Sequence, residues 1–403
     1  MNGDKRKSKL NIICVKKSGV MPEQTGDVIK LQSEQTWLAP DYYDNFHCKG
    51  GACRNSCCGG WGISVSQDEY FRLIGLDCSE ELHHKLECAF HLADDPTPER
   101  YALISPNWLG DCPMHDEDGL CRLHRECGEG RLPSICRLYP RRLSEESGRR
   151  KCVCSTSCEG VVEMLMAEQE PLSFHEEKLT IEASLEKTVD PHLVEAGCAC
   201  LKLLQNRSRA LPVRLRGVRR LLEIFERSGA YDPDAAEKAV SEAVLPPDDK
   251  ALFAVVRMLR RLSENSPSLE RFGAEAFERY GAADGEALAR YAADRRHFES
   301  AFPDWTRIFE NVLANHVFYE DFPYADDRLT VTGEYVGLAG GYAAMRVLCI
   351  GFMAGRDSLN DLVDVIAGLF RCVEHAAFYL NADYLLEQDA RADAALLDDV
   401  LNL

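Results

Sequence analysis

The segment Cys48-Lys-Gly-Gly-Ala-Cys53-Arg-Asn-Ser-Cys57-Cys58 places four thiols within eleven residues, and it decides how the rest of the chain is interpreted. A second group of cysteines lies between residues 112 and 158. Thirteen of the eighteen cysteines fall between Cys48 and Cys158. Thiols gathered this tightly either cross-link one another or hold a metal.

The amino-terminal segment lacks the pattern of a secretory signal. A signal peptide needs an apolar stretch of about 7–15 residues, whereas the basic residues 5–9 lead only into the short run 10–15. We therefore expect a cytoplasmic protein whose thiols face a reducing environment. Clustered cysteines in that setting are more typical of metal ligands or catalytic groups than of disulfides.

The composition is that of a globular protein with an acidic surface. The chain has 47 basic and 66 acidic residues, which gives a formal net charge of −19. Nucleic acid is not an expected partner, because phosphate binding needs a basic face. An acidic surface instead favours encounter with basic groups, including lysine side chains. At about 150 residues per domain, the length predicts two or three domains.

One apolar segment has the length of a membrane span. Residues 335–355 carry a single charge, Arg346, near their middle. That charge would cost about 2.5–3.5 kcal/mol on membrane insertion, and the run is rich in Gly and Ala rather than Leu and Ile. We interpret it as a helix buried in a helical domain and expect no membrane span.

The pattern divides the chain into three parts. Residues 1–40 form a lead-in, residues 41–160 a cysteine-rich domain, and residues 161–403 an all-helical domain. The helical stretches of the middle part are short, the clearest being 67–74 and 80–92, so we expect bound metal to supply the organisation that a core of side chains would otherwise give. The predicted fold class is mainly α, with an irregular cysteine-rich metal-binding domain followed by an all-α helical domain.

Apolar stripes at helical spacing support the all-α assignment of the third part. One stripe includes Leu215 and Val218 and places Arg214 and Arg216 among the solvent-facing positions. Further helices are predicted over residues 302–319, 334–353, 359–380 and 389–401.

The cysteine spacing leaves three alternatives open. Structural zinc usually takes two Cys-x(2–4)-Cys pairs that close a tetrahedron, and adjacent Cys57 and Cys58 fit one such site poorly. An iron–sulfur cluster tolerates ligands from scattered loops because its metals are spread over a larger cube. We favour an iron–sulfur cluster over zinc and over no metal. Eight well-placed cysteines are too many for one four-iron cluster and enough for two.

Several short motifs carry these cysteines. They are Phe46-His47-Cys48, Cys53-Arg-Asn-Ser-Cys57-Cys58-Gly59-Gly60-Trp61, Asp111-Cys112-Pro113, Gly119-Leu120-Cys121 and Leu132-Pro-Ser-Ile-Cys136-Arg-Leu-Tyr-Pro-Arg141. Together they resemble the cysteine signature of the flagellin lysine-N-methylases, within the wider group of YkgJ-like cysteine-cluster proteins. Ser157-Cys158-Glu159 is similar to the family's Ser-Cys-Pro-Glu, with the proline missing. The resemblance continues more weakly through residues 309–318 and 372–375.

The resemblance implies an S-adenosylmethionine-dependent enzyme that methylates the ε-amino groups of surface lysines on flagellin and carries an iron–sulfur cluster of the 4Fe-4S type. The cysteines that match the signature, and are therefore the expected metal ligands, are Cys48, Cys53, Cys57, Cys58, Cys112, Cys121, Cys136 and Cys158. Cysteines that do not match, among them Cys152 and Cys154, are interpreted as structural.

Methyl transfer to lysine requires a neutral amine. A free lysine has a pKa of about 10.4, so the site must desolvate it or place a base beside it. The catalytic candidates are Tyr335, Glu374 and His375, and the cofactor-binding candidates are Asn311, Asn315 and Arg346. No Gly-x-Gly-x-x-Gly fingerprint marks a nucleotide site, and we interpret the glycines at 337–341 as close helix packing.

A second class of function stays open. The cysteine-rich part could be a non-enzymatic metal- or redox-sensing module, with the helical part as a platform for a protein partner. Binding of S-adenosylmethionine would discriminate between the two classes.

Overall fold

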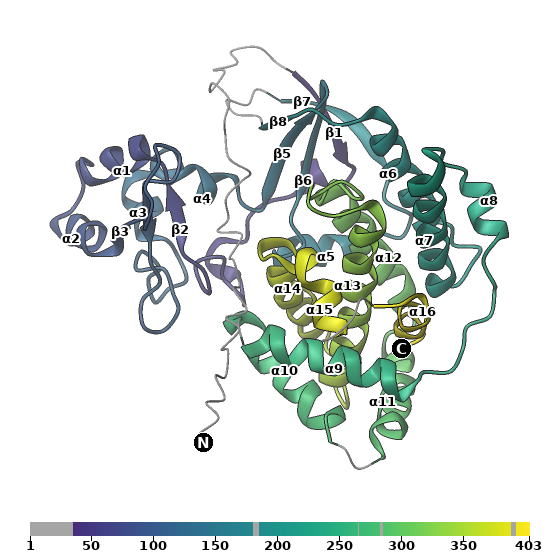
Figure 1. Cartoon of the computed structure of the whole chain (residues 1–403). Helices are drawn as coiled ribbons and strands as arrows, with labels where there is room; N and C mark the ends of the chain where they lie inside the picture. The colour runs from purple at the N-terminus through teal and green to yellow at the C-terminus, as the bar shows by residue number, and fades with distance from the viewer. Residues whose placement is uncertain (1–34, 180–184, 265, 283–284, 388–391) are drawn as a thin grey trace, which may run out of the picture.

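The computed structural model describes residues 35–179, 185–264, 266–282, 285–387 and 392–403. A large helical body carries a five-stranded sheet at one end and a small lobe at its side (Figure 1). The mainly α fold class is thereby confirmed. Cys14, residues 1–34 of the lead-in and the start of the helix predicted at 389–401 lie outside the described residues.

The small lobe, residues 59–138, is built on a three-stranded antiparallel sheet. Its order is β2-β4-β3, with β2 at Ile63–Val65, β4 at Ala102–Ile104 and β3 at Phe90–Leu92. The helices of the lobe are α1 (Gln67–Ile74), α2 (Glu80–Ala89), α3 (Arg122–Cys127) and α4 (Ser134–Leu138). Helix α1 begins with a capping box, in which Ser66 and Glu69 each satisfy the other's backbone N–H.

The lobe has a hydrophobic core of its own, which corrects the expectation that metal replaces one. Val65, Leu73, Leu82 and Leu86 are all buried in this core. They come from three short elements, β2, α1 and α2, so no single stretch shows sustained periodicity. The core is therefore assembled from contacts between elements rather than from one amphipathic stripe.

A five-stranded sheet joins separated parts of the chain. Its order is β7-β1-β6-β5-β8, with β7 at Phe174–Leu179, β1 at Gln35–Pro40, β6 at Arg149–Cys154, β5 at Arg141–Glu146 and β8 at Leu185–Lys187. Strands β5 and β6 form a hairpin, whereas β1 runs parallel to β6 and antiparallel to β7. Strands β7 and β8 lie beyond residue 160, so the third part, which was predicted to be all-helical, contains two strands between its first two helices.

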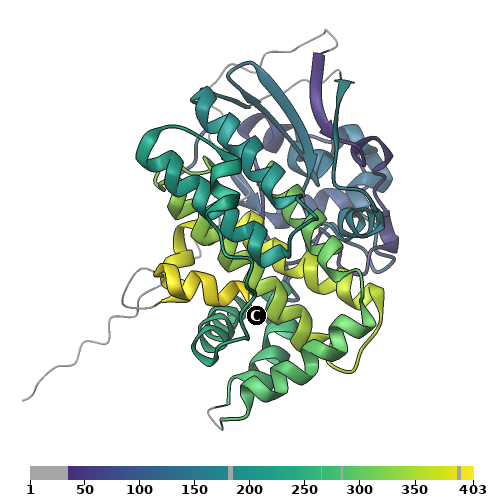
Figure 2. The same cartoon turned by 90° about the vertical axis from the view of Figure 1, so that its right-hand side faces the viewer.

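The helical body follows the sheet. Its helices are α5 (Glu159–Ala167), α6 (Pro191–Leu204), α7 (Leu211–Ser228), α8 (Pro233–Lys238), α9 (Asp249–Glu264), α10 (Pro267–Tyr280), α11 (Ala287–Ala301), α12 (Trp305–Tyr319), α13 (Val331–Phe352), α14 (Leu359–His375), α15 (Phe378–Leu386) and α16 (Ala394–Leu401). Figures 1 and 2 show the strands at one end of this body and the green helices α10 and α11 at the other.

Helix α13 is the central helix of the body. Every residue from Glu334 to Phe352 is buried. Among the described residues it is the helix with the length and hydropathy of a membrane span, and its most apolar window is entirely buried inside the fold. A Cβ at Gly337 would lie 2.4 Å from the ring of Tyr379. Close packing therefore requires glycine at position 337, whereas a Cβ at Gly340 or Gly341 would make only ordinary contacts, at 3.6 and 3.8 Å.

The helix predicted at 359–380 is two helices. Helix α14 ends at His375, where Ala376 takes an extended conformation (φ −126°, ψ 176°), and α15 begins at Phe378. This break places Glu374 and His375 in the last turn of α14. That turn faces the segment between β6 and α5, which is where the candidate site lies.

Candidate functional site

The eight predicted metal ligands lie in the small lobe and at its junction with the body, and all are free thiols. Three of them, Cys48, Cys57 and Cys136, are exposed, and the other five are half-buried. Cys152 and Cys154, which were interpreted as structural, are buried in β6.

Four of the eight thiols gather in the small lobe and at residue 58, which immediately precedes it. Here the Cys112 N–H donates to the Cys58 carbonyl over 2.6 Å, and His115 pairs with Cys121 in a short β-bridge. Every pair among the four thiols interacts electrostatically. We call this set the distal thiols: Cys58, Cys112, Cys121 and Cys136.

The other four thiols surround the start of α5, and we call them the proximal thiols. Cys48, Cys53 and Cys158 interact electrostatically with one another. Cys57 also interacts with Cys48, but more strongly with Cys58 and Cys136, so it lies between the two sets. Burial raises the pKa of Tyr139, and the neighbouring thiols Cys158 and Cys57 raise it further.

A carboxylate fixes the loop that carries the first proximal thiols. Glu159, the first residue of α5, accepts hydrogen bonds from the backbone N–H of Asn55 at 2.7 Å and of Arg54 at 3.1 Å. Lys49 Nζ donates to the same carboxylate over 2.7 Å. Burial opposes the charge of Glu159, but the bonds from Lys49 and the two amides outweigh it and lower its pKa. The loop is thereby held against Cys158.

Adjacent Cys57 and Cys58 differ in acidity. A hydrogen bond between the two thiols raises the pKa of Cys57 and lowers that of Cys58 to about 6. Burial raises the pKa of Cys112 to about 12 and that of Cys53 to about 11. Metal binding must therefore release protons from most of these thiols, since only thiolates are good ligands.

The thiols fit a metal cluster better than a single zinc ion. Zn–S bonds of about 2.3 Å in a tetrahedron place the sulfur atoms about 3.8 Å apart. Within the part of the chain that is described, no three cysteine sulfur atoms lie within 4.8 Å of one another. An all-thiol donor set with wider spacing is typical of iron–sulfur ligation.

The carboxylate of Glu374 is the centre of a buried hydrogen-bond network. Its Oε2 accepts from Ser155 Oγ over 2.6 Å, and its Oε1 lies 3.1 Å from His316 Nδ1. His316 Nε2 in turn lies 2.9 Å from the Tyr379 hydroxyl. A proton on Nδ1 of His316 would satisfy Glu374 and leave Nε2 to accept from Tyr379.

His375 lies next to this network and is half-exposed. Its Nε2 is 2.8 Å from Ser157 Oγ and 3.1 Å from Ser155 Oγ. Ser155 and Ser157 are themselves buried and belong to the segment between β6 and α5. The last turn of α14 is therefore bonded to the residues that immediately precede Cys158.

An aromatic wall connects His375 to the proximal thiols. The Trp61 ring lies 5.2 Å from the imidazole of His375, and the Tyr139 ring lies 6.3 Å from it. Trp61 Nε1 donates to the Cys57 carbonyl over 2.9 Å, and the Tyr139 hydroxyl is 3.0 Å from Ser157 Oγ. We call this assembly the junction site; it comprises Trp61, Tyr139, Ser155, Ser157, Glu374 and His375.

The two predicted asparagines hold backbone groups beside the junction site. Asn315 Nδ2 donates to the Cys154 carbonyl over 3.0 Å, and its Oδ1 accepts from Tyr42 over 2.6 Å. Asn311 Nδ2 donates to the carbonyls of Leu165 and Glu168. Both amides are thus engaged with the chain itself, with Asn315 the nearer to the junction site through Cys154.

Tyr335 and Arg346 lie on α13, away from the other candidates. The buried Tyr335 hydroxyl has no hydrogen-bond partner among the described residues, and it faces the charges of Arg219 and Asp398. Arg346 is fully buried, stacks on Trp305 at 3.6 Å and donates to the Leu403 carbonyl. The structure therefore brings Glu374 and His375 together and leaves Tyr335 and Arg346 apart from them.

Four members of the junction site were not predicted as functional. Ser155, Ser157, Trp61 and Tyr139 lie within or next to the cysteine motifs, and three of them occur in the quoted signature. The sequence feature that could have identified them as functional is their position beside the cysteines. Their partner, His375, lies 218 positions or more further along the chain, so sequence spacing could not connect them.

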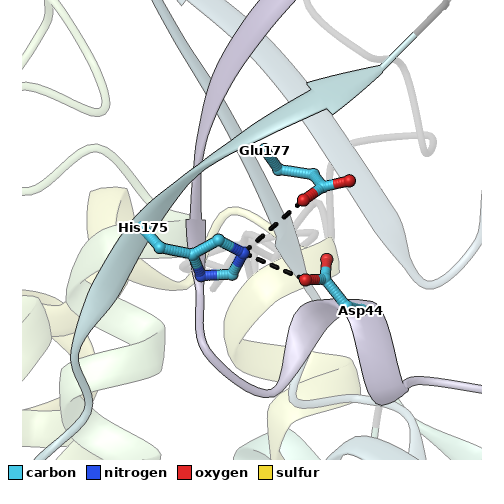
Figure 3. A group of neighbouring side chains, drawn as sticks. All are labelled: Asp44, His175 and Glu177. Atoms are coloured by element: carbon cyan, nitrogen blue, oxygen red, sulfur yellow. Dashed lines mark hydrogen bonds and ion pairs between the residues drawn. The ribbon is translucent and has the colours of Figure 1, made fainter.

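A separate cluster of potential ligands lies on the outside of the five-stranded sheet. His175 on β7 has Nε2 at 3.0 Å from an Asp44 oxygen and 3.7 Å from Glu177 (Figure 3). Its Nδ1 lies 3.1 Å from Asp41. Both nitrogens therefore already have carboxylate partners, and the cluster acts as a set of ion pairs between β7 and the turn after β1.

The chain is similar in sequence to proteins of known function. Residues 199–397 match the model of the FliB lysine N-methylase C-terminal domain. A lysine-N-methylase of Salmonella choleraesuis (strain SC-B67) and one of Salmonella typhimurium (strain LT2) are each 25% identical over 148 residues. The flagellar biosynthetic protein FliU of Salmonella muenchen is 26% identical over 155 residues.

The matches to the three relatives cover only part of this chain. They cover 36% of this chain in all three cases, 36% of each lysine-N-methylase and 85% of the FliU protein. The match thus spans about a third of the length of the two lysine-N-methylases. No solved structure gives a significant match. These matches support the resemblance to the flagellin lysine N-methylases that the motifs carry, over about half of the chain.

Proposed function

We propose that this protein is a lysine N-methyltransferase that uses S-adenosylmethionine to methylate surface lysines of flagellin in the cytosol. One observation carries the proposal: the region that matches the lysine N-methylase domain contains Glu374 and His375, and the structure joins both to the cysteine-rich part. The names of the relatives, a lysine-N-methylase and a flagellar biosynthetic protein, support the substrate.

The junction site has the groups that methyl transfer to an amine needs. The lysine nitrogen attacks the sulfonium methyl, the new N–C bond forms as the S–C bond breaks, and S-adenosylhomocysteine leaves. The ammonium proton must be lost before attack, since the free pKa is about 10.4. His375 is the half-exposed group that would accept it, with Ser155 and Ser157 fixing its Nε2.

Two features of the junction site would support this proton transfer. The rings of Trp61 and Tyr139 form an apolar wall beside His375 that would favour the neutral amine over the charged one. The buried carboxylate of Glu374 contacts Ser155, which also contacts His375. Glu374 therefore acts as a positioning residue through the serine.

The cysteine-rich part would hold the iron–sulfur group through the eight thiols of the proximal and distal sets. When bound, such a group supplies one-electron chemistry and cross-links the segments that bind it. The proximal thiols adjoin the aromatic wall at Cys57, so a group bound there would also shape the junction site.

Tandem mass spectrometry of the cognate flagellin tests the function. Anaerobically purified protein and S-adenosylmethionine should add increments of about 14 Da to several exposed lysines. The rate should rise with pH as the amine loses its proton, and high salt should weaken encounter with the acidic protein. Absence of methyl-lysine with intact metal would favour the metal- or redox-sensing module instead.

A further inference from the structure

A histidine and two carboxylates converge beside the edge strand of the five-stranded sheet. His175 Nε2 lies 3.0 Å from an oxygen of Asp44 and 3.7 Å from an oxygen of Glu177. One ligand atom from each of the three side chains lies within 4.8 Å of the other two (Figure 3). We propose that Asp44, His175 and Glu177 form a binding site for a divalent transition-metal ion, with zinc as the best fit.

The pairing of β7 with β1 places two of the ligands on one face of the sheet. His175 lies opposite Ala39 and Glu177 lies opposite Trp37 in this antiparallel register. Because side chains alternate between the two faces of a strand, residues two positions apart point the same way. The third ligand, Asp44, comes from the short 3-10 turn η1 (Tyr43–Asn45), which follows β1 in the chain. The site is therefore built by the fold from two segments that are distant in sequence.

The ligand atoms have the spacing of a tetrahedral site. Zinc bonds to imidazole nitrogen and carboxylate oxygen are about 2.0–2.2 Å long, so the ligand atoms of a tetrahedral zinc lie about 3.3–3.5 Å apart. The two distances from His175 Nε2, 3.0 and 3.7 Å, lie on either side of this range. Three protein ligands leave the fourth position open to water. A site of nitrogen and oxygen donors binds zinc more tightly than manganese.

The second nitrogen of His175 has the partner that is typical of a metal-bound histidine. Such a histidine usually donates its other ring N–H to a carboxylate, which fixes the ring and directs the free nitrogen at the metal. His175 Nδ1 lies 3.1 Å from Asp41 Oδ1, and Ser173 Oγ donates to the other oxygen of Asp41. With its proton on Nδ1, His175 presents the lone pair of Nε2 to Asp44 and Glu177.

The charge of this cluster favours a cation. Asp41, Asp44 and Glu177 place three carboxylates around one imidazole, and none of them forms an ion pair with a lysine or arginine in the described part of the chain. Without metal, a proton on Nε2 bonds to Asp44 only, because Glu177 at 3.7 Å is beyond hydrogen-bond distance. The ion pairs of His175 are therefore the metal-free arrangement, and a divalent ion in place of that proton would bind all three ligands.

A metal at this site would join the edge of the sheet to the segment that enters the cysteine-rich part. Asp44 lies shortly before Cys48, the first of the expected cluster ligands. A bound ion would hold that segment against β7. The inference depends neither on methyl transfer nor on metal at the thiols, so each of the three can fail separately.

Manganese(II) tests the site with little interference from the cysteines, because thiolates are soft ligands whereas carboxylates suit manganese. The full chain is freed of metal with a chelator and titrated with manganese chloride, and free manganese is measured by electron paramagnetic resonance. We expect about one tight site per chain in the wild type, and none in His175→Gln or Glu177→Gln. Asp41→Asn keeps all three ligands and should weaken binding about 10–100-fold.

The matched control is His192→Gln. His192 also lies near a carboxylate, at 3.6 Å from Glu195, but it faces that one alone. This variant should bind manganese like the wild type. Circular dichroism in chelator checks the fold of every variant, and Glu177→Gln reports on the site if His175→Gln is misfolded.

Zinc content identifies the preferred metal. After equilibration with excess zinc and removal of the free ion, the wild type should hold about one zinc per chain more than His175→Gln or Glu177→Gln, because the thiols contribute equally to all three proteins. Zinc should also raise the melting temperature of the wild type more than that of either variant, since an ion that binds the folded state stabilises it.

Several results would overturn the site. Equal manganese binding by the wild type, His175→Gln and Glu177→Gln would show that these side chains hold no metal. A loss in His192→Gln as large as that in His175→Gln would indicate unspecific binding to an acidic surface. Tight manganese binding without the additional zinc would reject zinc as the preferred ion.

Discussion

Ser155 donates a hydrogen bond of 2.6 Å to the carboxylate of Glu374, across 219 positions of the sequence. Ser155 ends the segment that leaves β6, and Glu374 lies in the last turn of α14. Because Cys158 follows three residues later, this bond couples the cysteine-rich part to the helical body. A change at Ser155 should therefore affect both stability and the geometry of His375.

Ser155→Ala should destabilise the protein by about 1–3 kcal/mol, the usual cost of leaving a buried acceptor unsatisfied. The variant leaves Glu374 Oε2 without its donor and removes one of the two hydroxyls beside His375 Nε2. The urea concentration at the midpoint of unfolding and the rate of flagellin methylation should both fall. Ser241→Ala, at an exposed position, is the matched control and should change neither.

His375→Gln should lower the rate of methylation by about 10²–10⁴-fold, the usual contribution of a general base. Its fold should persist, because the side chain is half-exposed and the amide can still bond to Ser157. Raising the pH should rescue part of the loss, since more substrate lysine is then already neutral. The control is His192→Gln, at an exposed position on α6. Unchanged rates for His375→Gln across the pH range would place the base elsewhere.

Elements governed by local signals could be predicted from the sequence. The stretch 67–74 coincides with α1, whose capping box and amphipathic pattern lie within nine residues of chain. The segment 334–353 likewise corresponds to α13, because a long apolar run with glycines allows few alternatives. Glu374 and His375 could be selected as candidates in the same way, because they are polar residues at the end of an apolar helix.

Elements governed by distant partners could not be predicted. Strand β1 pairs with β6 and β7, and Leu38 lies opposite Lys151, more than a hundred residues away. The expectation that Arg214 and Arg216 face solvent is wrong, because both side chains are buried. Arg214 shows the reason. Its guanidinium is buried and bonds to Glu310 on α12, which no local pattern indicates.

Asp321→Asn should destabilise the protein by about 1–3 kcal/mol, because Arg142 loses its carboxylate partner and Lys151 keeps only Glu146, at 3.3 Å. Asp321 accepts from Lys151 and, at 2.7 Å, from Arg142. Burial opposes its charge, but the two cations outweigh burial and hold the pKa of Asp321 below its usual value. Its stabilisation should therefore be present above the unfolded pKa of about 3.9 and be lost as the pH falls through the folded value.

Asparagine suits this test because Asp321 has φ 59°, a left-handed conformation that asparagine also tolerates. The variant therefore removes the charge with little added backbone strain. Asp357→Asn, on the surface between α13 and α14, is the control. Equal urea midpoints for the two variants would show that the buried cations find other partners.

Tyr335→Phe distinguishes a catalytic tyrosine from a core residue. The hydroxyl is buried without a partner among the described residues, so its removal should keep or raise stability by up to ~1 kcal/mol. Methylation should be unchanged, because the ring faces Arg219 and Asp398 rather than His375. A large loss of activity with unchanged thermal stability would restore the catalytic role predicted from the sequence.

His175→Gln should make the stability of the sheet less dependent on pH. Partial burial opposes the imidazolium, but hydrogen bonds to Asp41 and Asp44 outweigh it and raise the pKa of His175. The charged histidine therefore adds stability that is complete below the unfolded pKa of about 6.5 and is lost as the pH rises through the folded value. The melting temperature of the wild type should exceed that of the variant by more at about pH 5.5 than at about pH 9. If this difference in melting temperature is constant, or is larger at high pH, these ion pairs do not hold β7 to the turn after β1.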